Sequence, residues 1–415
     1  MPLPEGVGRR LLCAGGAGLL AAPFLAIPSG ARAQQETAIR GRDGWLFAPW
    51  DRLDRVDLTN IPRVCEIIGE AMRMVRAAGI EVVLALIPAK ATIYRDMMPP
   101  EMPPSREALG RYALIHRSLQ EQRAGWLPDL LSPMLQARAA RPDQRLFFRA
   151  DTHWTAAGAE LCAAEVARFI RAQIPLPPPP GPGERLGPPV VRTRSRADLL
   201  PFLPAAERRN YPPEEYLIRA PVRAGAGGLV GEDRADVMAL GSSFLAPEFN
   251  FSPALSAGLG RPVALEWRVA NIGPYATLTG YLGSQLFRRQ RPRLLVMSLL
   301  EQPMVLLPGN RSAFPEHAMS ADSFLDRVRE ALAARLCGGH DTAGMTCRPY
   351  RAQGWCGGCA PKQRHTSGRT GPSGGEISGR WYDMPTASRA GWAGGVYGSP
   401  MSRRRVASIA PPRMA

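Results

Sequence analysis

The chain has 415 residues, a net charge of +16 and a hydrophobic content of 45%. This length allows one large domain or two ordinary ones, and the apolar content suffices for a substantial core. Half of the excess positive charge lies after Gly338, and no basic stripe carries the interleaved aromatic residues that bind single-stranded nucleic acid. We therefore expect no nucleic-acid partner.

The first 33 residues have the organisation of an export signal. Arg9 and Arg10 precede an apolar stretch over 11–27, and Ala31-Arg32-Ala33 has the Ala-x-Ala pattern of a cleavage site. We expect residues 1–33 to be a signal peptide, with the paired arginines suggesting the twin-arginine route, and the mature protein to lie in a bacterial periplasm. The alternative is an uncleaved membrane anchor, against which the glycines within the apolar stretch argue.

Helical and strand patterns alternate along the mature chain. In chain order, the periodicity predicts helices over 61–78, 106–122, 127–139 and 155–172, strands over 237–240 and 263–269, a helix over 276–289, a strand over 294–300 and a helix over 320–336. A continuous apolar strand over 82–87 follows the first helix. Thr155 is placed to cap the fourth helix. This alternation predicts an α/β fold with an open parallel sheet flanked by helices.

Two stretches interrupt that pattern. Residues 174–195 are rich in proline and glycine and predict a linker or surface excursion between the two halves of the sheet. After residue 338 the periodicity disappears, so we expect one domain over 34–337 and a disordered tail over 338–415. Cys65 and Cys162 lie in predicted helices, where we expect them to be buried. The single Cys356-x-x-Cys359 pair is too weak a signal for a redox or metal site.

His153 and Ser243 have the local contexts that acyl transfer requires. His153 belongs to Asp151-Thr152-His153-Trp154, just before a capped helix, where a nearby carboxylate can orient an imidazole that accepts a hydroxyl proton. Asp-x-His alone is equally compatible with a structural or metal-binding role. Ser243 follows a buried strand through Gly241-Ser242, which would place its hydroxyl at the carboxyl edge of the sheet.

An ordered set of motifs resembles the alginate O-acetyltransferase family, SGNH-hydrolase-like proteins of the AlgX and AlgJ kind. The motifs are GRDGWLF at 41–47, IPAKATIY at 87–94, DTHW at 151–154 and GSSF at 241–244, with further agreement at 249–251 and Glu301. The similarity runs from about Gly41 to Pro308. As in that family, the Asp-His pair precedes the serine, a circularly permuted order relative to ordinary SGNH hydrolases.

The resemblance implies periplasmic transfer of acetyl groups to hydroxyls of an exopolysaccharide, alginate or a similar polymer. Ser243 would form the acetyl-enzyme, His153 would act as general base and then acid, and Asp151 would orient it. The implied partners are the polysaccharide acceptor and a membrane-bound acyltransferase that passes acetyl groups outward; we expect no cofactor and no metal. An esterase or deacetylase using the same triad, or a non-catalytic component of a secretion complex, are the alternatives.

The chain departs from the family pattern in two places. The family's Gly-Thr-Ser-Tyr-Ser is Gly-Ser-Ser-Phe-Leu at 241–245, and its Glu-Arg pair after the last strand is Glu301-Gln302, without the guanidinium. Both changes affect the expected binding of the acceptor and leave the three triad residues in place.

Further candidates for oxyanion or substrate contacts are Gly273, Asn271, Lys90, Tyr94, Arg149 and Trp154. Gly273 is equally compatible with an ordinary turn glycine, and Trp154 with an indole packed beneath the helix start. Lys90 stands out because Lys90 and Lys362 are the only lysines among 52 basic residues. Either a guanidinium does not fit at position 90, or an ordinary ion pair tolerated lysine there.

Overall fold

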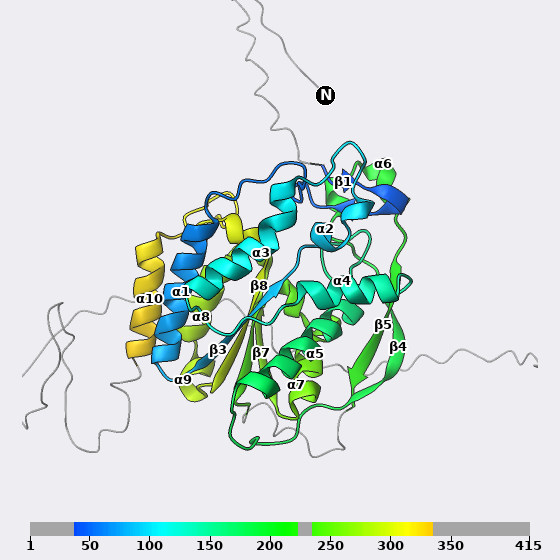
Figure 1. The fold of residues 1–415 in the computed structure, drawn as a ribbon. Coiled ribbons are helices and arrows are strands. Elements are labelled where there is room, and N and C mark those ends of the chain that lie inside the picture. The colour runs from blue at the N-terminus through cyan, green and yellow to red at the C-terminus, as the bar shows by residue number, and fades with distance from the viewer. Residues whose placement is uncertain (1–36, 223–234, 335–415) are drawn as a thin grey trace, which may run out of the picture. The chain divides into compact units, whose positions relative to one another are not determined.

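The computed structural model describes residues 37–222 and 235–334. Its centre is a four-stranded parallel sheet in the order β3-β8-β6-β7 (Figure 1). The strands are β3 (Glu81–Ile87), β6 (Val237–Ser242), β7 (Val263–Arg268) and β8 (Leu294–Leu300). Because all four run in the same direction, their carboxyl ends share one edge of the sheet.

Helices cover both faces of this sheet (Figure 1). Successive residues of a strand point to opposite faces: in β3, Val83 and Ala85 belong to one core cluster while Val82 and Leu84 belong to the other. The first cluster lies beneath α4 (Leu131–Ala140), α5 (Ala156–Gln173) and α7 (Phe251–Leu259), and the second beneath α1 (Ile61–Ala77), α3 (Arg106–Glu121), α8 (Gly273–Leu282) and α10 (Ala321–Ala333). The α/β class expected from the sequence is confirmed.

Two of the expected helices differ from the prediction. The helix expected over 276–289 is two helices, α8 and α9 (Gln285–Arg289), because the Ser284 side chain accepts a hydrogen bond from the Phe287 amide and starts a new helix. The helix expected from residue 127 begins only at Leu131, where the Asp129 carboxylate accepts hydrogen bonds from the first amides. The expected cap of α5 is present, since the Thr155 hydroxyl accepts from the Gly158 amide at 3.5 Å.

The excursion expected over 174–195 contains a strand in its second half, because β4 (Leu186–Arg194) pairs with β5 (Glu214–Pro221) in an antiparallel ribbon. The short helix α6 (Ala205–Arg208) lies between these strands in the sequence. A second small ribbon, β1 (Ile39–Arg40) with β2 (Leu46–Phe47), lies near the short helix α2 (Lys90–Ile93) (Figure 1).

Several expectations from the sequence concern features beyond the sheet. Cys65 and Cys162 are buried and free, as expected. None of the helices within 37–222 and 235–334 is long and apolar enough to cross a membrane. The expected signal peptide and the expected tail over 338–415 lie outside the described residues.

Candidate active site

Ser243 lies directly after the carboxyl end of β6. Strand β6 pairs with β8 only as far as Leu240, so Gly241 and Ser242 pair with β7 alone. The chain then turns into a short 3-10 segment, Ser243–Leu245, where the Ser242 hydroxyl accepts from the Phe244 amide. This turn presents the Ser243 hydroxyl at the edge where active sites of parallel α/β sheets lie.

The loop before α5 brings His153 and Asp151 to this serine. His153 Nε2 lies 2.8 Å from Ser243 Oγ, and His153 Nδ1 lies 2.6 Å from Asp151 Oδ1, which also accepts from the His153 amide at 2.9 Å. Trp154 ties the two loops together, because its indole donates to the Phe244 carbonyl at 2.8 Å. The three residues selected from the sequence therefore form one hydrogen-bonded chain of the serine-histidine-aspartate type.

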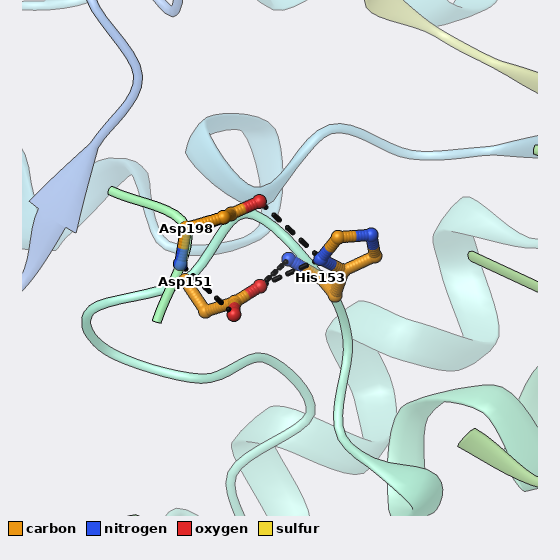
Figure 2. Close-up of side chains that lie close together, drawn as sticks. All are labelled: Asp151, His153 and Asp198. Atoms are coloured by element: carbon orange, nitrogen blue, oxygen red, sulfur yellow. Dashed lines mark hydrogen bonds and ion pairs between the residues drawn. The ribbon is translucent and has the colours of Figure 1, made fainter. Parts of the chain in front are cut away.

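Two further charged side chains, those of Arg194 and Asp198, belong to this cluster. Both follow the prolines of the excursion in the sequence. Arg194, the last residue of β4, donates to Asp151 Oδ2 at 2.8 Å, and the Asp198 amide donates to the same oxygen at 3.2 Å. The Asp198 carboxylate lies 3.4 Å from His153 Nδ1. Figure 2 shows both carboxylates beside the imidazole, Asp198 from a different segment of the chain. The sequence interpretation missed Arg194 and Asp198, since nothing in the local sequence connects them to the histidine.

The cluster stabilises the charged forms of its members. Burial alone would lower the pKa of His153, but the hydrogen bonds and charges of Asp151 and Asp198 raise it to about 9. Burial alone would raise the pKa of Asp151, but the hydrogen bond and charge of His153, together with Arg194, hold it below its ordinary value. An imidazolium at this position is therefore strongly favoured.

The carboxylates of Asp151 and Asp198 and the imidazole of His153 lie within 4.8 Å of one another, a spacing at which such groups also bind cations. The guanidinium of Arg194 already binds Asp151, and the Thr152 hydroxyl already donates to Asp198. A cation would meet the positive charge of Arg194 at close range. The arrangement therefore fits a proton on His153 better than a metal ion.

A small cavity of about 40 Å³ opens beside the serine turn, between the diverging ends of β6 and β8 and the start of α8. Gly241, Ser242 and Gly273 line it. Gly273 has φ +75° and begins α8, and a side chain there would overlap Phe314. Asn271 is exposed and does not line this cavity. Of the two oxyanion candidates, Gly273 lies near the serine turn, but its amide already donates to the Ala270 carbonyl and is not free to bind an oxyanion.

Lys90 is buried beneath the site and does not face it. Its ammonium donates to three backbone carbonyls, those of Leu46, Arg149 and Asp151, at 2.6 to 2.9 Å. Burial lowers its pKa to about 8, against the opposing charges of Asp51 and Asp151. All three ammonium hydrogens are used within the protein, so Lys90 joins β2 to the catalytic loop.

The other three candidates, Tyr94, Trp154 and Arg149, differ in their exposure. Tyr94 is buried, stacks on Trp45 with 4.1 Å between ring centroids, and its hydroxyl accepts from the Leu146 amide. Trp154 is fully buried under the start of α5. Arg149 is partly exposed and lines a hollow of about 180 Å³ with Gly44 and other residues of the adjoining loops. Of these three side chains, that of Arg149 is the one that reaches the surface.

Glu301 keeps a guanidinium partner although Gln302 replaces the arginine expected beside it. Its carboxylate is completely buried, accepts from the Ala89 amide at 2.7 Å, and accepts from Arg111 of α3 at 2.8 Å. The guanidinium partner thus comes from a helix that is distant in the sequence, whereas the sequence analysis considered only the residue next to Glu301.

Comparison with known proteins agrees with this geometry. The family described as an SGNH hydrolase-like domain, acetyltransferase AlgX, matches residues 38–301. The chain belongs to this family. Sequence relatives include proteins named "Probable alginate O-acetylase AlgJ" from Pseudomonas fluorescens (29% identity over 66% of this chain and 68% of the relative) and Pseudomonas aeruginosa (30% identity over 63% and 69%).

A solved structure shares the fold of this AlgX-type domain. The O-acetyltransferase domain of Pseudomonas putida AlgJ aligns with a TM-score of 0.55 and 24% identity, covering 72% of this chain and 99% of that domain. The family resemblance and the SGNH-like parallel sheet expected from the sequence are both confirmed.

Proposed function

We propose that this protein is an exported O-acetyltransferase that transfers acetyl groups, through an acetyl-enzyme on Ser243, to hydroxyls of an exopolysaccharide such as alginate. The observation that carries the proposal is the continuous chain from Ser243 Oγ through His153 to Asp151, with contacts of 2.8 and 2.6 Å, at the carboxyl edge of the sheet. Family membership supplies the reaction class.

In the first half-reaction, Ser243 Oγ attacks the carbonyl carbon of an acetyl donor while His153 Nε2 takes the hydroxyl proton. Asp151 holds the Nδ1 proton of the ring and stabilises the imidazolium. The imidazolium then protonates the leaving group as the acetyl-Ser243 ester forms. We propose that backbone amides of the serine turn stabilise the oxyanion.

In the second half-reaction, an acceptor hydroxyl attacks the ester and gives its proton to His153. Collapse of the tetrahedral intermediate returns that proton to Ser243 Oγ and releases the acetylated polymer. Water in place of the acceptor would give an esterase by the same steps. The balance between the two depends on how well the acetyl-enzyme is shielded from water.

Incubation with a chromogenic acetyl ester, followed by peptide mass spectrometry, tests the nucleophile. We expect acetate release and an acetyl group on the Ser243 peptide, both lost in Ser243→Ala, and retention of the labelled peptide in the neighbouring variant Ser242→Ala. Undiminished turnover in Ser243→Ala would rule out the proposed nucleophile. Adding an oligosaccharide acceptor separates the activities: an acetylated sugar indicates a transferase, and acetate alone an esterase.

We also propose that the protein acts in the periplasm and receives acetyl groups from a membrane-bound acyltransferase. The basic, apolar and Ala-x-Ala order within residues 1–33 supports export. Cell fractionation with N-terminal sequencing checks this proposal, with Gln34 expected as the first residue of the exported form.

A further inference from the structure

We propose that Asp198 is a positioning residue for the histidine. Its carboxylate is a second anionic partner of His153, and its negative charge makes up for the charge of Asp151 that Arg194 offsets. This inference rests on the proposed function, in which His153 carries the transferred proton. Figure 2 shows the juxtaposition on which it depends, with the carboxylates of Asp151 and Asp198 both lying on the Nδ1 side of His153.

The first step concerns Asp151, whose carboxylate is shared between two cations. One oxygen binds His153 Nδ1 at 2.6 Å, and the other accepts from the Arg194 guanidinium at 2.8 and 2.7 Å. A guanidinium in direct contact offsets most of the carboxylate's charge at its neighbours. Asp151 therefore orients the ring, while its net attraction for a positive imidazole is reduced by Arg194.

The second step concerns the fixed position of Asp198. One carboxylate oxygen accepts from the Thr152 amide at 2.7 Å, and the other accepts from the Thr152 hydroxyl and lies 3.4 Å from His153 Nδ1. Its own backbone amide donates to Asp151 Oδ2 at 3.2 Å. These contacts hold the carboxylate beside the imidazole although its side chain is 38% exposed.

The third step is the balance of charge around the ring. Asp151, Asp198 and Arg194 together carry one net negative charge, which a protonated His153 neutralises. Two more charges lie one contact further away and oppose each other: Lys90, 2.9 Å from the Asp151 carbonyl, and Glu248, 3.6 Å from Arg194. Without Asp198 the imidazolium formed in each half-reaction would be an uncompensated charge.

The uncharged neighbours of the ring increase the need for negative charge near the imidazolium. Phe249 stacks on His153 with 5.0 Å between ring centroids, Phe244 lies 4.8 Å away, and only 12% of the His153 side chain is exposed to water. Fewer waters remain to solvate the imidazolium, and nearby carboxylates therefore matter more. Arg194, near the end of the proline-rich excursion, and Asp198, four residues later, thus act on the triad as a pair.

The variant Asp198→Asn tests the inference, because it removes the charge and keeps the shape and an oxygen acceptor. We expect the pKa of His153 to fall by about one unit, and the acid limb of kcat/KM to move down with it. NMR of ¹⁵N-labelled imidazoles measures the pKa directly, since the chain has 5 histidines to assign. Asp198→Glu should restore much of the shift.

Glu248→Gln is the matched control, because it removes a carboxylate from the same cluster that contacts Arg194 and not His153. We expect it to move the pKa of His153 by less than about a third of the change seen in Asp198→Asn. Equal shifts in the two variants, or an unchanged His153 in Asp198→Asn, would overturn the inference. If Asp198→Asn does not fold, Thr152→Val provides a second test by removing one of the two hydrogen bonds that Thr152 donates to the Asp198 carboxylate, with a smaller shift in the same direction expected.

The NMR measurement does not require activity. If the pKa of His153 falls as expected in Asp198→Asn but the protein releases no acetate, the role of Asp198 is supported and the proposed function is refuted. Acetate release with no shift in Asp198→Asn would do the reverse.

Discussion

Replacing Gly241 by alanine should disturb both stability and catalysis, because the side chain of Ser298 in β8 lies directly against Gly241 just before the serine turn. An added Cβ would lie 1.9 Å from Ser298 Oγ and 3.0 Å from both Ser298 Cβ and Leu245 Cδ1. Ordinary contacts between such atoms are near 3.5 to 4 Å. Overpacking of this kind costs about 1–3 kcal/mol. We expect about 3 kcal/mol here, because two side chains must move.

Ser298 provides the second arm of a double-mutant cycle. Its hydroxyl is buried and has no hydrogen-bond partner among the residues that the structure describes. Ser298→Ala alone should therefore change the free energy of unfolding by less than about 0.5 kcal/mol. With the hydroxyl gone, the closest approach to the Gly241→Ala methyl becomes 3.0 Å, so the cost of that change should fall to about 1 kcal/mol.

Urea unfolding of the four proteins measures the coupling, expected at about 2 kcal/mol. Gly110→Ala is the control, because a Cβ there meets nothing within 4 Å and alanine favours helix α3. Displacing the serine turn should also lower kcat for an acetyl ester about 100-fold in Gly241→Ala, with partial recovery in the double variant. An equal cost of Gly241→Ala in both backgrounds would refute the steric argument.

Three further outcomes follow from the site. Because the pKa of His153 is raised to about 9 and the reaction needs the neutral ring, kcat/KM should increase from pH 7 towards pH 9; a flat profile over that range would contradict this. Trp154→Phe removes the indole bond to the Phe244 carbonyl and should cost about 1–2 kcal/mol in urea unfolding, with reduced turnover. Glu301→Gln leaves the buried Arg111 unpaired and should lower stability by about 3–5 kcal/mol by the same measurement, whereas a loss below about 1 kcal/mol would show that other groups satisfy Arg111.

The parallel sheet was predictable because three of its strands contain short, continuous apolar runs and the fourth, β7, has an alternating apolar pattern. Residues 294–300 form a strand with the bounds that the sequence indicates, since both of its faces are buried. The break between α8 and α9 was less visible, because Gly283 and Ser284 interrupt a pattern that otherwise continues as a helix. Local capping decided that boundary, and a serine within a helical pattern is a weak signal.

Lys90 shows how composition can mark a position without revealing its role. Arginine is the usual cation of this chain, so the lysine at position 90 indicated either a site that a guanidinium does not fit or an ordinary ion pair. The structure gives the reason: three carbonyls converge on a single atom, which a tetrahedral ammonium satisfies and a planar guanidinium does not. The carbonyls belong to β2 and to the loop before α5, which are far apart in the sequence, so the partners could not be inferred.

The residues of the cluster around His153 also differ in how far the local sequence reveals their role. Asp151 and Ser243 lie in motifs whose local geometry is encoded by neighbouring residues, a capped helix in one case and a strand end in the other. Arg194 and Asp198 lie more than 40 positions from His153 in the sequence and reach it only because β4 pairs with β5 and carries them to the loop. A charge pair delivered in this way can alter the proton affinity of the imidazole without altering any residue of the triad motifs. A substitution at Arg194 or Asp198 is therefore expected to shift the pH range of the proposed mechanism in this protein.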